Sequence, residues 1–409
     1  MPSIRIKNIG PITDTGVINL TPVMLLIGKQ STGKSTFMKI LSYCSWLEKR
    51  IMVDGEELVQ KYTHYGRFVR ELKSFHRMSD SFLSHNSEIH FDGECVGINL
   101  SGNKGNAKIT RKSNYEKQRH NTKISFIPSE RNMVSAIQNI NKAYKTSDYD
   151  ALYNYIWEFD EAKGAYRKEN PLEMPFDCGI AFFHDERSDK DMVLLKQLGN
   201  SIETFYASSG IQSALPIIVM VDYLKSVVGL ARKLSPKDIT NAIAKAVLDK
   251  SKGLEDFSGV DLGRISQLLQ YRNVQLFIEE LEQNLFPESQ FALVRSLVKS
   301  IQEASVRTGM DSRVVMTTHS PYVLTSLNYL MKAAAALAKN PEETVKIVSA
   351  DEILPSNAYS AYWLTQNGYL EDIVDHEYGF IMGDRLDEIS EVMAVETEKM
   401  NDIIYGNFI

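Results

Sequence analysis

The chain has 409 residues, of which 43% are hydrophobic and 24% are charged, and its formal net charge at pH 7 is −6. This composition is typical of a globular protein with one large core or two, and it excludes a general electrostatic attraction to nucleic acid. Cys44, Cys95 and Cys178 lie far apart without metal-ligand spacing, so we expect reduced, structural thiols in a cytoplasmic protein. No apolar run approaches about 18 residues, so we expect no membrane contact.

A phosphate-binding loop (P-loop) is the first motif along the chain. The apolar strand Val23–Ile27 leads into Gly-Lys-Gln-Ser-Thr-Gly-Lys-Ser-Thr, and a helix over residues 37–46 is expected to follow. The match to G-x-x-x-x-G-K-[ST] between a strand and a helix predicts an anion site made of backbone N–H groups. Lys34 would contact the β- and γ-phosphates of ATP, and Ser35 would hold Mg²⁺. The predicted nucleotide-binding residues are Gly28, Lys29, Gln30, Ser31, Thr32, Gly33, Lys34, Ser35 and Thr36.

Alternating strand and turn signals over residues 88–127 predict an antiparallel β layer. A basic segment within it could meet a phosphate backbone, which leaves DNA open as a partner. Glu116 and the acidic balance of the chain favour a solvated face instead. The cations of this segment are Lys104, Lys108, Arg111, Lys112, Lys117, Arg119 and Lys123.

Pro128-Ser-Glu-Arg follows this layer and permits two interpretations. It resembles the P-[AS]-E-R segment that supplies a lid-loop contact in related bacterial ATPases, where Ser129, Glu130 or Arg131 would contact Mg²⁺ or phosphate. It also fits a proline turn that caps a helix, and both interpretations stay open. Beyond it we expect a mainly helical and hairpin insertion, whose aromatic residues pack a lid onto the core. These aromatic residues are Tyr144, Tyr149, Tyr153 and Trp157.

Ser208 and Gly210 lie directly before a helix that is expected to begin near Ser213. A hydroxyl and a glycine N–H at a helix N-terminus suit an anion, although Ser-Ser-Gly is also a common N-cap. The segment resembles the L-S-x-G-x-Q signature of ABC-type ATPases in their structural-maintenance-of-chromosomes (SMC) branch, with Ala207 in place of leucine. In that family the signature faces the γ-phosphate held by the other protomer. The resemblance therefore implies ATP sandwiched between two subunits of a homo-oligomer.

An apolar strand over residues 274–278 ends in two adjacent carboxylates, Glu279 and Glu280. In P-loop enzymes the first such acid orders Mg²⁺, and the second can activate the attacking water as general base. Successive strand residues point to opposite faces, so the two acids can serve different partners. Two ordinary glutamates at a solvated turn are the alternative. Related proteins usually have proline after the acids, and Leu281 is expected to loosen this turn.

Residues 312–321 predict a strand that ends in His319-Ser-Pro, after an intervening helix over residues 288–308. This matches the switch histidine of the same family, whose neutral imidazole can bond the γ-phosphate and sense its loss. Further on we expect a strand at Val345–Ser349, a hairpin turn at Asn367-Gly368, and an acidic amphipathic helix over residues 384–399.

Together these motifs resemble the stand-alone ABC-like ATPases of bacterial defence operons, including the ATPase subunit of the PARIS anti-phage system. The resemblance covers the chain from Ile4 to the hairpin near Asn367. It implies an α/β fold of the ABC-type P-loop class, with a mixed β-sheet core, an antiparallel β layer and a helical lid insertion. We expect the N-terminal half of the core in residues 1–129, the insertion in residues 130–205 and the C-terminal half in residues 206–409.

The function that this resemblance implies is ATP hydrolysis at a dimer interface, used as a sensor or switch. No long heptad region separates the motifs, and the residues after His319 are poor in clustered acids. We therefore expect a separate effector protein as partner. A DNA-handling ATPase and an ATP-stabilised scaffold with little turnover are the alternatives.

Overall fold

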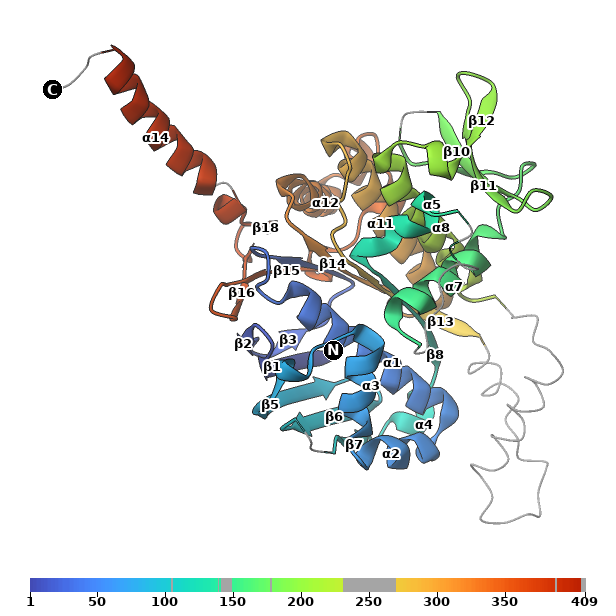
Figure 1. Ribbon diagram of the computed structural model, residues 1–409, viewed down its shortest axis with the longest axis vertical. Coiled ribbons are helices and arrows are strands. Elements are labelled where there is room, and N and C mark those ends of the chain that lie inside the picture. The colour runs from blue at the N-terminus through green and yellow to red at the C-terminus, as the bar shows by residue number, and fades with distance from the viewer. Residues whose placement is uncertain are drawn as a thin grey trace.

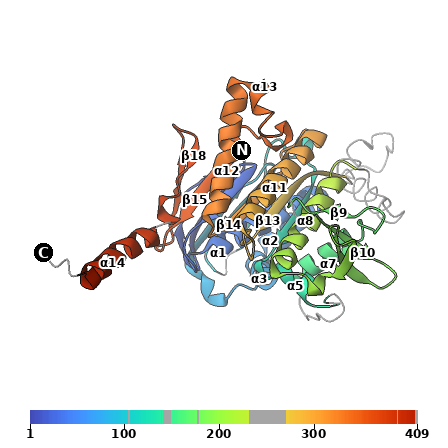
Figure 2. The same cartoon turned by 90° about the horizontal axis from the view of Figure 1, so that it is seen from above.

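A central β-sheet runs through the molecule, with helices on both of its faces (Figures 1 and 2). The computed structural model describes residues 1–103, 106–138, 140, 149–176, 179–230, 270–386 and 388–405. The central strands are β4 (Val23–Ile27), β8 (Asn121–Ile127), β13 (Tyr271–Ile278), β14 (Arg313–Thr318), β15 (Tyr359–Leu364) and β16 (Leu370–Asp372). Their order is β16-β15-β4-β14-β13-β8, and every pairing is parallel except that of β15 with β16.

The parallel strands are covered on both faces, and every residue of β4 and β14 is buried. Continuous apolar strands of this kind are characteristic of parallel sheets that lie between layers. The predicted fold class is therefore confirmed as α/β, with a mixed core sheet and a separate antiparallel layer.

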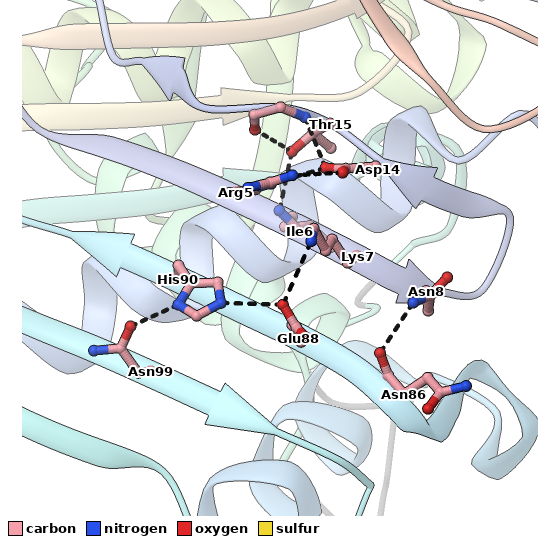
Figure 3. A network of polar contacts seen from close by, with 11 residues as sticks. Arg5, Ile6, Lys7, Asn8, Asp14, Thr15, Asn86, Glu88, His90 and Asn99 are labelled. Atoms are coloured by element: carbon pink, nitrogen blue, oxygen red, sulfur yellow. Dashed lines mark hydrogen bonds and ion pairs between the residues drawn. The ribbon is translucent and has the colours of Figure 1, made fainter.

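The antiparallel layer is a second sheet whose main path is β2-β1-β5-β6-β7, with β3 on β1. Its strands are β1 (Ser3–Ile9), β2 (Ile12–Asp14), β3 (Ile18–Asn19), β5 (Leu83–Asp92), β6 (Val96–Ser101) and β7 (Lys108–Arg111). Its outer face is polar, as Figure 3 shows: Arg5 donates to both carboxylate oxygens of Asp14, at 3.0 and 2.7 Å, and Glu88 contacts Lys7 and His90. The hydrogen bond to Arg5 lowers the pKa of the Asp14 carboxyl.

The antiparallel layer is shorter than predicted, because residues 121–127 form β8 of the central sheet. Strand β8 pairs in parallel with β13, from Asn121 opposite Tyr271 to Ile127 opposite Ile278. The prediction was wrong for this stretch because a half-buried antiparallel strand and the edge of a parallel sheet share one alternation of apolar and polar residues.

The central sheet divides the buried residues into two cores, one on each of its faces, and helices cover both. The core between the central sheet and the antiparallel layer contains α1 (Lys34–Asp54), α2 (Glu56–Thr63) and α3 (Arg67–His76). The core on the other face contains α7 (Ala151–Lys163), α8 (Ser209–Val227), α11 (Pro287–Thr308) and α12 (Pro321–Lys339). Figure 2 shows α8, α11 and α12 together on their side of the sheet.

The insertion after β8 combines helices with a small antiparallel sheet of order β12-β11-β10-β9. Its elements are η2 (Ser129–Asn132), α5 (Met133–Ala136), α7, β9 (Leu172–Glu173), β10 (Ile180–Asp185), β11 (Lys190–Leu195), β12 (Asn200–Glu203) and η3 (Thr204–Tyr206). The aromatic residues that pack α7 onto the core are Tyr155 and Phe159, whereas Trp157, predicted for this role, is 58% exposed. Tyr144 lies outside the described residues.

Helix α8 is long and apolar enough to cross a membrane, although no apolar run of about 18 residues was expected. It packs as a core helix against α7 and α11, and its residues from Ser213 to Val221 are buried. This burial inside the protein explains its composition. Residues 231–269, which follow this region, lie outside the described residues.

The C-terminal region contains one further error of prediction. Residues 345–349 are not a strand: α13 (Pro341–Thr344) precedes them, and Ile347 is 73% exposed. Proline at the start of α13 and the Asn340 side chain, which accepts from the Glu343 N–H, begin a helical turn instead. The hairpin at residues 367–368 is confirmed, since β15 and β16 pair around it.

The remaining elements are η1 (Asp80–Phe82), α4 (Tyr115–Gln118), η5 (Ala350–Glu352), η6 (Ser356–Ala358), β17 (Val374–Asp375), β18 (Phe380–Ile381), η7 (Asp384–Leu386) and α14 (Glu388–Tyr405). Helix α14 covers most of the predicted acidic helix and projects away from the rest of the molecule in Figures 1 and 2.

The β15–β16 hairpin packs tightly against the turn between β1 and β2. Gly368 has φ +77°, and a Cβ there would overlap the Pro11 carbonyl and lie 2.6 Å from the Thr13 nitrogen. Gly379 has a similar φ of +69° with nothing within 4 Å, so it isolates the cost of the backbone conformation. We predict that Gly368→Ala lowers the free energy of unfolding in urea by about 1–3 kcal/mol more than Gly379→Ala does. If both variants lost the same free energy of unfolding, the atoms around Gly368 would have to move aside without cost.

Candidate nucleotide-binding site

The P-loop connects the end of β4 to the start of α1 and lies against the hairpin strand β15. A Cβ at Gly28 would lie 2.5 Å from the Leu364 carbonyl oxygen, so only glycine fits there. Ser31 adopts a positive φ of 61°, unusual for a residue with a side chain. Such turns gather successive backbone N–H groups into a nest for an anion, at the N-terminus of the 21-residue helix α1.

Lys34 crosses this loop. It is 7% exposed, and its Nζ donates to the carbonyls of Gly28 at 2.7 Å and Lys29 at 2.8 Å. Burial lowers the pKa of Lys34 to about 8, while the charges of Glu280 and Glu282 act to raise it. At neutral pH the loop therefore holds a buried ammonium group, suited to phosphate oxygens.

Glu279 lies directly beside the P-loop. Its carboxylate accepts a hydrogen bond from the Ser35 hydroxyl, and its Oε2 accepts one from the Ser129 N–H at 3.3 Å. Burial raises its pKa, against the opposing influence of Lys39 and Ser35. Its Oε1 is buried and has no hydrogen-bond partner among the described residues. An unpaired carboxylate oxygen next to a P-loop hydroxyl is a donor set that fits Mg²⁺, so the residues present suit this ion.

Glu280 occupies a strained backbone conformation with φ 45°. Its N–H donates to the Thr317 hydroxyl at 2.9 Å, and its carbonyl accepts from Arg131 at 2.7 Å. The next residue, Leu281, donates its N–H to the Thr317 carbonyl at 3.1 Å. Proline could not donate this bond, so Leu281 gives the turn a contact that proline would lack.

Arg131 is fully buried and acts as a structural link. Its guanidinium donates to the carbonyl of Glu279 at 2.6 Å, to that of Glu280 at 2.7 Å and to that of Ser213 in α8 at 3.0 Å. The residue therefore cannot serve as a phosphate ligand, one of the roles considered for it. From the same segment, Ser129 contributes its N–H to Glu279, and Glu130 is exposed.

His319 follows β14 at the same edge of the sheet and is partly buried. Glu282 fixes its backbone: one carboxylate oxygen accepts from the His319 N–H and the other from the Thr318 hydroxyl, both at 2.7 Å. Burial, reinforced by the charge of Lys34, lowers the pKa of His319. The imidazole is therefore neutral at pH 7 and can exchange a hydrogen bond with a phosphate.

Ser208 and Gly210 lie elsewhere, at the N-terminus of α8. This helix belongs to the core opposite that of α1. Ser208 is exposed and makes no capping bond with its side chain, unlike an ordinary N-cap serine. A Cβ at Gly210 would lie 2.9 Å from the Asn284 carbonyl, so the start of α8 is packed on the turn that follows the acids.

The basic segment is largely neutralised within the chain. Lys112 pairs with Asp92 at 2.8 Å, and Lys123 pairs with Glu158 at 2.8 Å with both side chains mostly buried. Glu116 pairs with both Arg111 and Arg119. Lys104 lies outside the described residues. This pairing favours the solvated-face interpretation over a site for a phosphate backbone.

Sequence reasoning missed the residues that hold the site together. Arg131, Thr317 and Glu282 act through backbone groups of Glu280 and His319, and no motif marks that kind of contact. Glu282 carried a signal as a third carboxylate two residues after Glu280, and Arg131 was singled out within Pro128-Ser-Glu-Arg for a different role. The structure brings the P-loop, Glu279, Glu280 and His319 to one edge of the sheet, where the parallel strands β4, β13 and β14 end.

Comparison with solved structures gives distant similarities. The SMC head domain from Thermotoga maritima is 10% identical, with a TM-score of 0.35, over 79% of this chain and 90% of that one. The ADP conformation of an ATP-binding cassette of an ABC transporter is 11% identical, with a TM-score of 0.28, over 91% and 90%. The recombination mediator protein RecF is 10% identical, with a TM-score of 0.33, over 91% and 97%. No protein-family model matches the sequence, and no curated protein does.

Loss of Arg131 should be strongly destabilising. In Arg131→Leu, three carbonyl groups lose a donor in a buried place, and each orphaned group costs about 1–3 kcal/mol. We expect the free energy of unfolding in urea to fall by about 3 kcal/mol or more. Arg187→Leu, at an exposed hairpin position, is the control and should stay within about 0.5 kcal/mol of the wild type. If the free energy of unfolding of Arg131→Leu also stayed within about 0.5 kcal/mol of the wild type, the structural role of Arg131 would be refuted.

Nucleotide affinity should depend on pH through Lys34. Phosphates around this lysine would raise its pKa above the value of about 8 in the free protein, so binding takes up a proton above that pH. We expect the Kd for ATP·Mg²⁺ to be flat below pH 8 and to weaken by up to about tenfold per pH unit above it. Calorimetry in buffers of different ionisation enthalpy measures both effects, and Lys34→Arg should abolish the pH dependence. A flat Kd up to pH 9.5 would contradict the lowered pKa.

Proposed function

We propose that the chain is an ABC-class ATPase that binds ATP·Mg²⁺ at an interface between two copies and hydrolyses it. The convergence of the P-loop, Glu279, Glu280 and His319 at the carboxyl edge of one parallel sheet carries the proposal. In P-loop ATPases this edge holds the phosphates, the metal and the attacking water.

Each residue has a distinct role in the proposed reaction. Residues 28–36 bind the phosphates, with Lys34 as the cation beside the transferred group. Ser35 and Glu279 hold Mg²⁺, which when bound offsets the phosphate charge. Glu280 accepts the proton of the attacking water, and neutral His319 bonds the γ-phosphate.

The second copy supplies the signature segment. Ser208 and Gly210 are at the N-terminus of a 19-residue helix, where backbone N–H groups favour an anion. Large apolar side chains are exposed around them: Phe205 at 42%, Tyr206 at 67% and Phe286 at 69%. A partner that buries this surface would bring Ser208 to its own γ-phosphate, which supports a nucleotide-sandwich dimer.

We further propose that the dimer is a sensor or switch for a separate effector protein in anti-phage defence. The support is the resemblance of the five motifs to defence ATPases, among them the ATPase subunit of the PARIS system. A cytoplasmic location and the three-part division at residues 129 and 205 belong to the same proposal. We do not extend it to DNA handling, because the described cations of the basic segment are mostly paired.

The deciding experiment is gel filtration with ATP·Mg²⁺ of the wild type and Glu280→Gln, each expressed with its genomic neighbours. Without the general base, hydrolysis should fall by about 10² or more, and the ATP-bound dimer should persist. We expect Glu280→Gln to elute as a dimer that carries a neighbouring gene product, and the wild type to revert to monomer as ATP is consumed.

Ser208→Arg in the Glu280→Gln background is the matched control. It leaves the P-loop untouched, so ATP should still bind while the dimer is lost. A monomer in Glu280→Gln despite bound ATP would overturn the sandwich. Full cellular activity of Glu280→Gln would favour a scaffold with little turnover, and a dimer without a co-purified protein would remove the effector from the proposal.

A further inference from the structure

Helix α14 projects from the rest of the molecule and carries an uncovered apolar stripe (Figures 1 and 2). Its side chains from Met393 to Tyr405 are all exposed. The stripe follows the spacing i, i+7, i+10 and i+11 along one face of the helix, and its residues, which are between 55% and 69% exposed, are Met393, Met400, Ile403 and Ile404. Val395 and Tyr405 are also exposed but lie outside this face.

Water does not favour a helix of this kind on its own. An isolated helix of 18 residues is only marginally stable, because most helical stability in proteins comes from the packing of an apolar face. Single exposed apolar residues are common on protein surfaces, whereas a continuous apolar stripe marks an interaction surface. The stripe on α14 is therefore suited to contact with another molecule.

One acid lies within the stripe. Glu396 is three residues after Met393 and four before Met400, so its carboxylate is on the same face of the helix. A carboxylate that enters an apolar contact needs an opposite charge there, because an unpaired charge loses its hydration without replacement. The complementary surface therefore has a lysine or arginine opposite Glu396.

This acid disfavours pairing of α14 with the α14 helix of a second copy. In a parallel pair, the two Glu396 carboxylates would face each other across the apolar seam and repel. In an antiparallel pair that matches Met393 with Ile403, each Glu396 would face a methionine and stay unpaired. Residues 393–405 also span only about 20 Å of helix, too little for two such helices to reach the about 800 Å² per partner that a stable interface buries.

The opposite face of α14 disfavours a lipid surface. Glu398 and Asp402 lie there, whereas helices that lie on membranes have lysine and arginine on their polar face. A groove in another protein satisfies both constraints, because it contacts a helix on more sides than a second helix does and can place a cation at one position.

We propose that α14 is a docking helix, which a separate protein receives in an apolar groove that has a lysine or arginine opposite Glu396. The proposal rests on the proposed function, which names a separate effector protein as partner. It adds the surface and the chemistry by which that partner is held.

Co-purification with the products of neighbouring genes tests the proposal in the full chain. The background is Glu280→Gln, in which the ATP-bound dimer should persist. We expect the amount of co-purified neighbour to fall at least about tenfold when Met400→Glu or Glu396→Lys is added, since each puts the wrong charge into the groove. Glu398→Lys is the matched control: it makes the same charge reversal on the opposite face and should retain the neighbour.

The dimer itself reports on the ATPase separately, because these variants lie outside the P-loop and the signature segment. A neighbour retained by both stripe variants would keep the effector and overturn its docking on α14. No co-purified neighbour in any variant would overturn both. A smaller assembly in Met400→Glu without loss of a neighbour would assign the stripe to a second copy, and sedimentation of the wild type with phosphatidylglycerol vesicles would assign it to lipid.

Discussion

The guanidinium of Arg131 joins three parts of the chain that carry the candidate chemistry. It is fully buried, so its N–H groups need hydrogen-bond acceptors inside the protein. They donate to the carbonyls of Glu279, Glu280 and Ser213. The hydrogen bonds to Glu279 and Glu280 hold the turn in which Glu280 has its strained backbone, and the bond to Ser213 holds the start of α8. The position of the candidate general base thus depends on a residue that would never touch the nucleotide.

The parallel central sheet explains how one chain gathers most of its motifs at one edge. The central sheet separates α1, which begins at the P-loop, from α8, which begins at Ser209. Strand ends bring Glu279, Glu280 and His319 to the P-loop because parallel strands finish at one edge. Helix α8 follows η3 of the insertion and not a strand of this sheet, and in the proposed dimer a second copy would bring its N-terminus to the phosphates.

Helix α1 links the distinct regions of the molecule. It begins with Lys34 and Ser35, lines a cavity of about 520 Å³ with Tyr43 and Trp46, and reaches the antiparallel layer through Glu48. Glu48 Oε1 accepts from the Cys95 and Val96 N–H groups at 2.7 and 3.1 Å, and burial raises the pKa of this carboxyl to about 7.

The sequence by itself determined the P-loop, the paired acids, the histidine at the end of its strand and most elements around them, because these patterns depend on neighbours along the chain. It could not assign β8 to its sheet or give Arg131 its role, since strand partners and buried carbonyl acceptors come from distant segments. Nor could it place Tyr43, Phe75 and Tyr271 around one cavity, whose walls come from five separate elements. Local chemistry follows from spacing in the sequence, whereas burial and long-range hydrogen bonding exist only once the chain has packed.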